Sequence, residues 1–160
     1  MGALSDLLRL ARERTEGADL SYAGALTPTE ACRVWQSAPG AKLVDVRTRA
    51  EQDFVGRIPG AVEIEWLRYP GGAENPYFLR QLSAEVDKEA LVLFICRSGR
   101  RSDLAATAAT AHGFTACYNV LEGFEGELDA NRQRGKVGGW RLAGLPWASD
   151  FGGSALLFGK

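Results

Sequence analysis

The chain has 160 residues, of which 46% are hydrophobic and 24% are charged, and its formal net charge is −1. These values are typical of one globular domain with a core of its own, and the near-neutral charge excludes a general attraction to nucleic acid or to an acidic membrane. There is no apolar run of about 18 residues that would span a bilayer and no N-terminal leader pattern. We therefore expect a soluble, cytoplasmic protein.

Three helices are predicted before the segment that contains Cys96. Apolar residues between positions 4 and 11 share one helical face, which predicts a helix over residues 4–14. Residues 27–30 have the capping-box pattern with proline at the first helical position, which predicts a helix over residues 28–37. Asn75 and Pro76 mark the start of a further helix.

Strands are predicted at residues 42–46, 61–64, 90–96 and 116–120. Two of them are nearly continuous apolar runs, as expected when helices cover both faces of a parallel sheet. The predicted fold class is therefore α/β. Ligands of such open sheets bind beyond the carboxyl ends of the strands, where Cys96 and the segment 45–47 are both expected.

The segment 91–102 is the most informative in the chain. It predicts a buried strand that ends at Cys96, a short loop rich in positive charge, and an alanine-rich helix over residues 102–112. A helix N-terminus and nearby guanidinium groups stabilise a thiolate, and Ser98 and Gly99 permit a turn with inward amides. This pattern favours a nucleophilic Cys96. The alternative is an inert cysteine at a strand end with arginines that face water.

Several segments, in the same order along the chain, resemble the rhodanese domain family. They correspond to its first-strand signature, its glycine-x-isoleucine-proline-glycine-alanine segment, its active-site loop and its closing segment. The similarity covers roughly residues 27–147. The matching segments are residues 43–51, 56–61, 96–102, 121–124 and 139–147.

The resemblance implies a three-layer fold, in which helices flank both faces of a central, mostly parallel sheet of about five strands. We expect an N-terminal helical extension over residues 1–20, the rhodanese-like domain over residues 21–148 and a C-terminal tail over residues 149–160. Two features depart from the family. Arg57 stands where the family usually carries histidine, and residues 126–138 form a longer, more polar segment that we expect near the edge of the site.

The resemblance also implies a sulfurtransferase that moves a sulfane sulfur from thiosulfate or a related anion to cyanide, a thiol or a protein acceptor. Cys96 would be the catalytic nucleophile and would hold the sulfur as a persulfide, with no metal or organic cofactor. The loop that follows it would bind the donor and stabilise the persulfide. The loop residues are Arg97, Ser98, Gly99, Arg100, Arg101 and Ser102, and the supporting residues are Asp45, Arg47 and Arg57.

The roles of the supporting residues stay open between two interpretations. Asp45 and Arg47 either support the site, by orienting the loop or by pairing with Glu51, or form a buried structural ion pair. Arg57 either adds positive charge at the mouth of the site or is simply solvated. A group of aromatic residues either forms an apolar wall around the pocket or seals the core. These aromatic residues are Trp66, Tyr69, Tyr77, Trp140 and Trp147.

Two other functions compete with sulfur transfer. Phosphatases and arsenate reductases also place a thiolate beside an arginine, but their loop has one more residue between the cysteine and the arginine than the four that separate Cys96 from Arg101. The pocket is therefore expected to be too small for phosphate. The second alternative is a non-enzymatic module that binds or senses sulfur. His112 is predicted to cap the end of its helix and not to act as a base for Cys96.

The remaining two cysteines, Cys32 and Cys117, are predicted to be packing residues on a helix and on a strand. Three cysteines leave one unpaired in any case, and their spacings match no zinc pattern. This cysteine usage indicates a reducing compartment.

Overall fold

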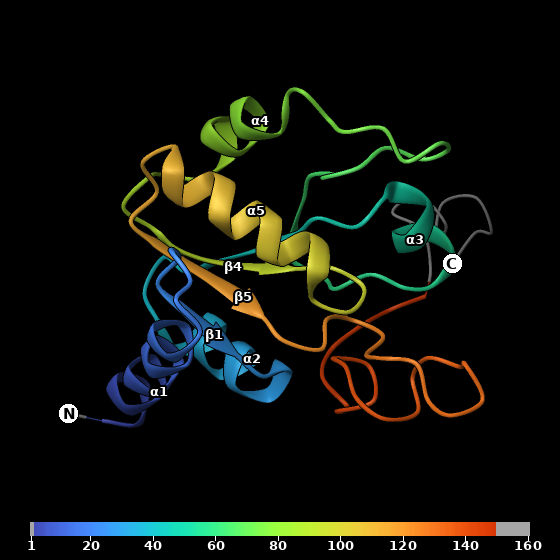
Figure 1. Cartoon of the computed structure of the whole chain (residues 1–160), viewed down its shortest axis with the longest axis horizontal. Helices are drawn as coiled ribbons and strands as arrows, with labels where there is room; N and C mark the ends of the chain where they lie inside the picture. Colours follow the sequence, from blue (N-terminus) through green and yellow to red (C-terminus); the bar gives the residue numbers. More distant parts are fainter. Residues whose placement is uncertain (1, 150–160) are drawn as a thin grey trace, which may run out of the picture.

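The computed structural model describes residues 2–149, so the predicted C-terminal tail lies outside the described residues except for Ser149. Its elements alternate along the chain (Figure 1). The helices are α1 (Ala3–Gly17), α2 (Pro28–Ser37), α3 (Arg49–Phe54), α4 (Phe78–Glu85) and α5 (Arg100–Ala111). The strands are β1 (Gly24–Leu26), β2 (Lys42–Asp45), β3 (Val62–Glu63), β4 (Leu91–Ile95) and β5 (Ala116–Val120).

The strands form one parallel sheet in the order β1-β5-β4-β2-β3. The central strand β4 pairs with β2 on one side, where Val44 lies opposite Phe94, and with β5 on the other, where Tyr118 lies opposite Leu93. All carboxyl ends therefore lie at one edge of the sheet. This confirms the prediction of a parallel α/β sheet.

Helices cover both faces of the sheet, as predicted. Figure 1 shows α4 and α5 on one face and α1 and α2 on the other. The side chains of β4 alternate between the two layers: Val92 and Phe94 pack with α4 and α5, whereas Leu93 and Ile95 pack with α1 and α2. Full burial of such side chains stabilises the fold by about 1.5–3 kcal/mol each, which makes β4 a rigid base for the residue that follows it.

The helix α2 has the predicted bounds because its start signal is local. The Thr27 hydroxyl accepts a hydrogen bond from the Glu30 amide, and the Glu30 carboxylate accepts one from the Thr27 amide at 2.9 Å. Arg14 of α1 donates two further hydrogen bonds to Glu30, at 2.7 and 3.1 Å. Hydrogen bonds from Arg14 hold the pKa of Glu30 below its usual value. These hydrogen bonds attach the N-terminal helix α1 to α2.

Some elements differ from the sequence prediction. The short strand β1 and helix α3 were not predicted, and the predicted strand 61–64 is reduced to two ladder residues at the sheet edge. α5 begins at Arg100, two residues earlier than predicted. α4 begins at Phe78 because the Asn75 side chain accepts a hydrogen bond from the Tyr77 amide at 3.1 Å and forms a turn before the helix.

Two of the three cysteines are core residues, as predicted. Cys32 lies on α2 and Cys117 on β5, and both are buried and free. Burial raises the pKa of both thiols, that of Cys117 to about 11. His112 is the C-terminal cap of α5, at the far end of that helix from Cys96, which confirms its predicted position. Among residues 2–149, no helix combines the length and apolarity needed to cross a bilayer.

Candidate active site

Cys96 directly follows β4 and lies at the carboxyl edge of the sheet. Only 1% of the residue is exposed, yet it contributes to the lining of a pocket with a volume of about 470 Å³. Cys96 is therefore a largely buried residue in the lining of this pocket. The other walls come from the loop itself, from Leu67, and from Glu127, Leu128 and Arg134 of the polar segment 126–138. That segment borders the site, where the sequence predicted it.

The backbone of the loop turns back onto the sulfur. The Gly99 amide donates a hydrogen bond to Cys96 Sγ at 3.1 Å. Gly99 has a φ of 109°, a left-handed conformation that favours glycine, and it caps the N-terminus of α5. Ser102, in the first turn of α5, places its Oγ 3.2 Å from Cys96 Sγ. Of the predicted loop residues, Gly99 and Ser102 therefore contact the sulfur of Cys96.

A second turn supports the loop from the side of β5. Phe124 and Glu125 donate backbone hydrogen bonds to the carbonyl oxygens of Cys96 and Arg97, at 2.8 and 2.9 Å. Gly123, with a φ of 65°, passes so close that a Cβ there would lie 2.5 Å from the Arg97 carbonyl. This close approach explains why the closing segment needs glycine. It makes the turn 122–125 a structural support for Cys96.

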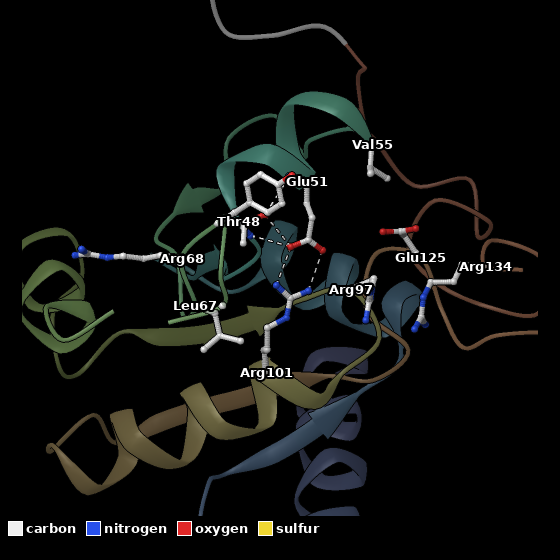
Figure 2. Close-up of a pocket in the computed structure, with 11 residues that line it drawn as sticks. Thr48, Glu51, Val55, Leu67, Arg68, Arg97, Arg101, Glu125 and Arg134 are labelled. Atoms are coloured by element: carbon white, nitrogen blue, oxygen red, sulfur yellow. Dashed lines mark hydrogen bonds and ion pairs between the residues drawn. The ribbon is translucent and has the colours of Figure 1, made fainter. Parts of the chain in front are cut away.

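The guanidinium group of Arg101 is bound to the carboxylate of Glu51. Its two terminal nitrogens donate to the two carboxylate oxygens of Glu51 at 2.7 and 2.9 Å (Figure 2). Burial disfavours the charged form of Glu51, but the hydrogen bonds from Arg101 and Thr48 outweigh it and lower the pKa of Glu51 to about 2. The sequence analysis considered Asp45 or Arg47 as the partner of Glu51. The partner is Arg101, which ties α5 to α3.

Arg97 and Arg100 are the uncommitted cations of the loop. Both are exposed and line the pocket that holds Cys96, and neither side chain has a hydrogen bond or ion pair among residues 2–149. Arg134 also lines the pocket, although its guanidinium donates to the Gly126 carbonyl at 2.8 Å. The positive charge available to an incoming anion therefore comes mainly from Arg97 and Arg100.

Asp45 and Arg47 form a buried ion pair, the structural one of the two interpretations. Both side chains are fully buried, and Arg47 Nη2 lies 2.7 Å from Asp45 Oδ2. The same nitrogen donates to the Gly56 carbonyl at 2.8 Å, and the guanidinium carbon lies 4.1 Å from the centre of the Phe124 ring. The pair thus joins the end of β2 to the turn beneath the loop, without touching the pocket.

Arg57 does not lie at the mouth of the described pocket. Its guanidinium forms ion pairs with Asp53 at 3.0 Å and Glu63 at 2.9 Å, and its backbone forms an antiparallel bridge with Ala148. Hydrogen bonds to Glu63 raise its pKa above the usual arginine value. Arg57 fits neither interpretation, because two carboxylates hold its side chain at the β3 edge, where it is mostly buried and does not line the described pocket.

The five aromatic residues divide between core and surface. Trp140 is fully buried, and Trp66 packs edge-on in the core. Trp147 packs on another ring, and the Tyr77 ring faces two arginines. Of the five, Tyr69 lines a second pocket with a volume of about 560 Å³. The predicted aromatic wall is therefore reduced to one residue.

The second pocket adjoins the first and extends the site. The two share Leu67, Arg97, Arg101 and Arg134, so they are adjacent, and together they are called the groove. Figure 2 shows Glu51 on α3, with Thr48 and Val55 at the two ends of that helix; Arg97, Glu125 and Arg134 also line this pocket. The turn 67–72 supplies another wall. The sequence analysis did not identify this turn, since nothing in its residues signals proximity to Cys96.

Asn119 is a further residue that the sequence analysis missed. Its Oδ1 lies 2.6 Å from Ser102 Oγ, and its Nδ2 lies 3.3 Å from the Gly99 carbonyl. Asn119 is 4% exposed and sits on β5, beside the strand that ends at Cys96. A signal was present: a polar amide near the carboxyl end of a predicted buried strand needs a hydrogen-bonding partner.

Comparison with known proteins extends this description. The family model for the rhodanese-like domain matches residues 30–129. An uncharacterised protein of Rickettsia conorii is 36% identical over 125 residues, which cover 74% of this chain and 92% of the relative. The crystal structure of Rv0390 from M. tuberculosis is 45% identical with a TM-score of 0.73 and covers 80% of this chain and 98% of that one. A chloroplastic protein of Arabidopsis thaliana named thiosulfate sulfurtransferase 16 is 31% identical over 87 residues, which cover 53% of this chain and 72% of the relative.

Proposed function

The chain belongs to the rhodanese-like domain family, and from this premise we propose that it is a sulfurtransferase that carries a sulfane sulfur on Cys96. The observation that carries the proposal is that Cys96 lines a pocket together with Arg97 and Arg100, two exposed arginines without a hydrogen bond or ion pair among residues 2–149. The name of the Arabidopsis relative supports thiosulfate as a donor to test first.

The first half-reaction loads the cysteine. The Cys96 thiolate attacks the outer sulfur of thiosulfate, the sulfur–sulfur bond of the donor breaks, and sulfite leaves with the bonding electron pair. Cys96 then holds a persulfide. Arg97 and Arg100 attract the anionic donor, and the Gly99 amide beside Sγ is placed to stabilise negative charge on sulfur.

The second half-reaction unloads it. A thiolate or cyanide attacks the terminal sulfur, the persulfide bond breaks, and Cys96 leaves as a thiolate that is ready for another donor. The groove beside the thiol gives an acceptor larger than cyanide a place to lie, since it continues past Arg97 and Arg101 to Tyr69. A small thiol or a protein cysteine is the acceptor class that we propose.

The ion pair between Arg101 and Glu51 argues against phosphatase chemistry. A phosphatase loop needs an arginine that is free to bind the phosphoryl oxygens. Here Arg101 is occupied by Glu51, and the next position is Ser102, whose hydroxyl faces Cys96 Sγ at 3.2 Å. The loop is therefore one residue shorter than a phosphatase loop, and its arginine closest to the phosphatase position is already bound to Glu51.

Intact mass of the purified protein, before and after thiosulfate, tests the proposal. The wild type and the matched control Cys32→Ala should each gain one sulfur atom that cyanide removes, whereas Cys96→Ala should gain none. Cys32 is a suitable control because it is buried in the core on α2. Steady hydrolysis of an aryl phosphate without sulfur uptake would overturn the proposal in favour of a phosphatase, and absence of both reactions would favour a binding module.

A further inference from the structure

We propose that Asn119 is a positioning residue that fixes the direction of the Ser102 hydroxyl group, so that this hydroxyl does not donate a hydrogen bond to the Cys96 thiolate. The three side chains come from β5, from the end of β4 and from α5, and all three residues are buried, at 4%, 1% and 0% exposure. Cys96 Sγ, Ser102 Oγ and Asn119 Oδ1 form a chain with steps of 3.2 and 2.6 Å.

The orientation of the Asn119 amide sets the direction of this chain. Its NH₂ group donates to the Gly99 carbonyl, at 3.3 Å, so its carbonyl oxygen is the atom that faces Ser102. A carbonyl oxygen can only accept a hydrogen bond. The Ser102 hydroxyl must therefore donate to Asn119, and the distance of 2.6 Å is within the usual range for an O–H···O bond.

The consequence for the sulfur follows from the single proton of a hydroxyl group. Because the Ser102 hydroxyl donates its hydrogen bond to Asn119, it presents a lone pair to Cys96 Sγ. A lone pair accepts a hydrogen bond from the S–H group of a thiol, but it repels a thiolate. The Gly99 amide donates to the same sulfur. The thiol is thus satisfied on both sides, whereas a thiolate requires Ser102 to turn away from Asn119 and to leave its carbonyl oxygen without a partner.

Other charged and titratable groups lie around this chain. On the far side of Asn119, Tyr22 donates to Asp103 at 2.6 Å, and burial together with Asp103 raises the pKa of Tyr22, which keeps it neutral. On the pocket side most of the charged groups are arginines, whose positive charge favours a thiolate and so acts against the Ser102 lone pair. These pocket-side groups are Arg97, Arg100, Arg101 with its partner Glu51, Glu127 and Arg134. The pocket-side groups stay the same in the variants below, and the contact of Asn119 with Tyr22 is lost equally with and without the Ser102 hydroxyl, so comparing the two backgrounds isolates the hydroxyl.

The inference rests on the proposed function only in that Cys96 is its nucleophile, and the test does not use sulfur transfer. The alkylation rate of Cys96 by iodoacetamide is followed across pH by mass spectrometry of the peptide that contains it. Asn119→Leu frees the Ser102 hydroxyl to donate to the thiolate, so the midpoint of the pH–rate profile should fall by about 0.5–1 pH unit, the equivalent of one hydrogen bond.

Ser102→Ala provides the background that separates this mechanism from a purely structural one. Without the hydroxyl, Asn119→Leu should leave the midpoint nearly unchanged relative to Ser102→Ala alone. An equal fall in both backgrounds would overturn the inference, because Asn119 would then act through its bond to the Gly99 carbonyl. No fall in the wild-type background would overturn it as well.

A second variant keeps the test decisive if Asn119→Leu fails to fold. Asn119→Asp preserves the shape of the side chain and holds the hydroxyl more strongly with a carboxylate oxygen. The midpoint should then rise, and it should rise more in the wild-type background than in Ser102→Ala, where only the added charge acts. A rise of the same size in both backgrounds contradicts a role for the Ser102 hydroxyl.

Discussion

Glu51 and Arg101 are fifty residues apart in sequence and form a bidentate ion pair that joins α3 to the first turn of α5. Both side chains are mostly buried, at 20% and 16% exposure. The same carboxylate accepts a hydrogen bond from the Thr48 amide at 3.0 Å, so Glu51 caps its own helix while it holds the arginine. The pair therefore fixes one side of the groove.

Glu51→Gln should destabilise the protein in a pH-dependent way. The pKa of Glu51 is lowered from 4.5 to about 2, so its contribution is fully present above pH 4.5 and is lost as the pH falls towards 2. The contribution at neutral pH is on the order of 2–3 kcal/mol. Urea unfolding at several pH values should show a large difference between wild type and variant at neutral pH and a small one in acid.

Glu63→Gln serves as the matched control for that prediction. Glu63 also pairs with an arginine, Arg57, but its side chain is 30% exposed at the sheet edge. Such pairs contribute about 0–1 kcal/mol. A loss as large as that of Glu51→Gln would contradict the importance given to the bridge between α3 and α5.

Replacement of Arg97 or Arg100 by glutamine should weaken capture of an anionic donor. Each removes one exposed charge near the pocket mouth, worth about 1 kcal/mol, so kcat/KM for thiosulfate should fall about fivefold through KM. The loss should shrink in high salt, because salt screens exposed charges. Arg57→Gln, remote from the pocket, should leave kcat/KM unchanged, and a loss equal to that of Arg97→Gln would contradict the assignment.

Gly123→Ala should cost both stability and sulfur transfer. A Cβ at this position would lie 2.5 Å from backbone atoms of Arg97 and 2.6 Å from the Cys96 carbonyl oxygen, so the loop must move. Gly40→Ala is the control, because Gly40 has a similar φ of 73° but open space around it. The Gly123 variant should lose about 2 kcal/mol more in chemical denaturation than the Gly40 variant. Equal losses would mean that backbone strain alone, and not contact with the loop, explains the glycine.

Local signals account for the parts of the fold that the sequence predicted well. The helix α2 has its predicted bounds because its capping box and its proline lie within four residues of its start. The strand β1 escaped prediction because Gly24–Leu26 is short and has no periodicity; it is a strand through its pairing with β5. A second capping box at Thr48 and Glu51 was present in the sequence, but it opens a helix of only six residues.

In the candidate site, too, the sequence predicted what is local along the chain and missed the contacts between distant segments. Cys96 and its loop are contiguous, so the sequence placed the thiol, the glycine and the helix start together. The partners of the loop come from elsewhere: Glu51 reaches Arg101, and Asn119 reaches Ser102 from another strand. Spacing along a chain does not report such contacts. Arg57 differs from these residues, since its partners Asp53 and Glu63 are only four and six residues away, and the sequence analysis did not consider either pair.

The outer walls of the groove beside Cys96 belong to different segments from the thiol and its supports, so the wall residues can be substituted independently. The thiol and its supports belong to the sheet and to the turn 122–125, whereas the outer walls come from the turn 67–72 and the segment 126–138. Insertions and substitutions in such surface connections cost little stability. Under the proposed function, changes confined to these two peripheral segments would alter which acceptor fits the groove and would leave Cys96 and its supports intact.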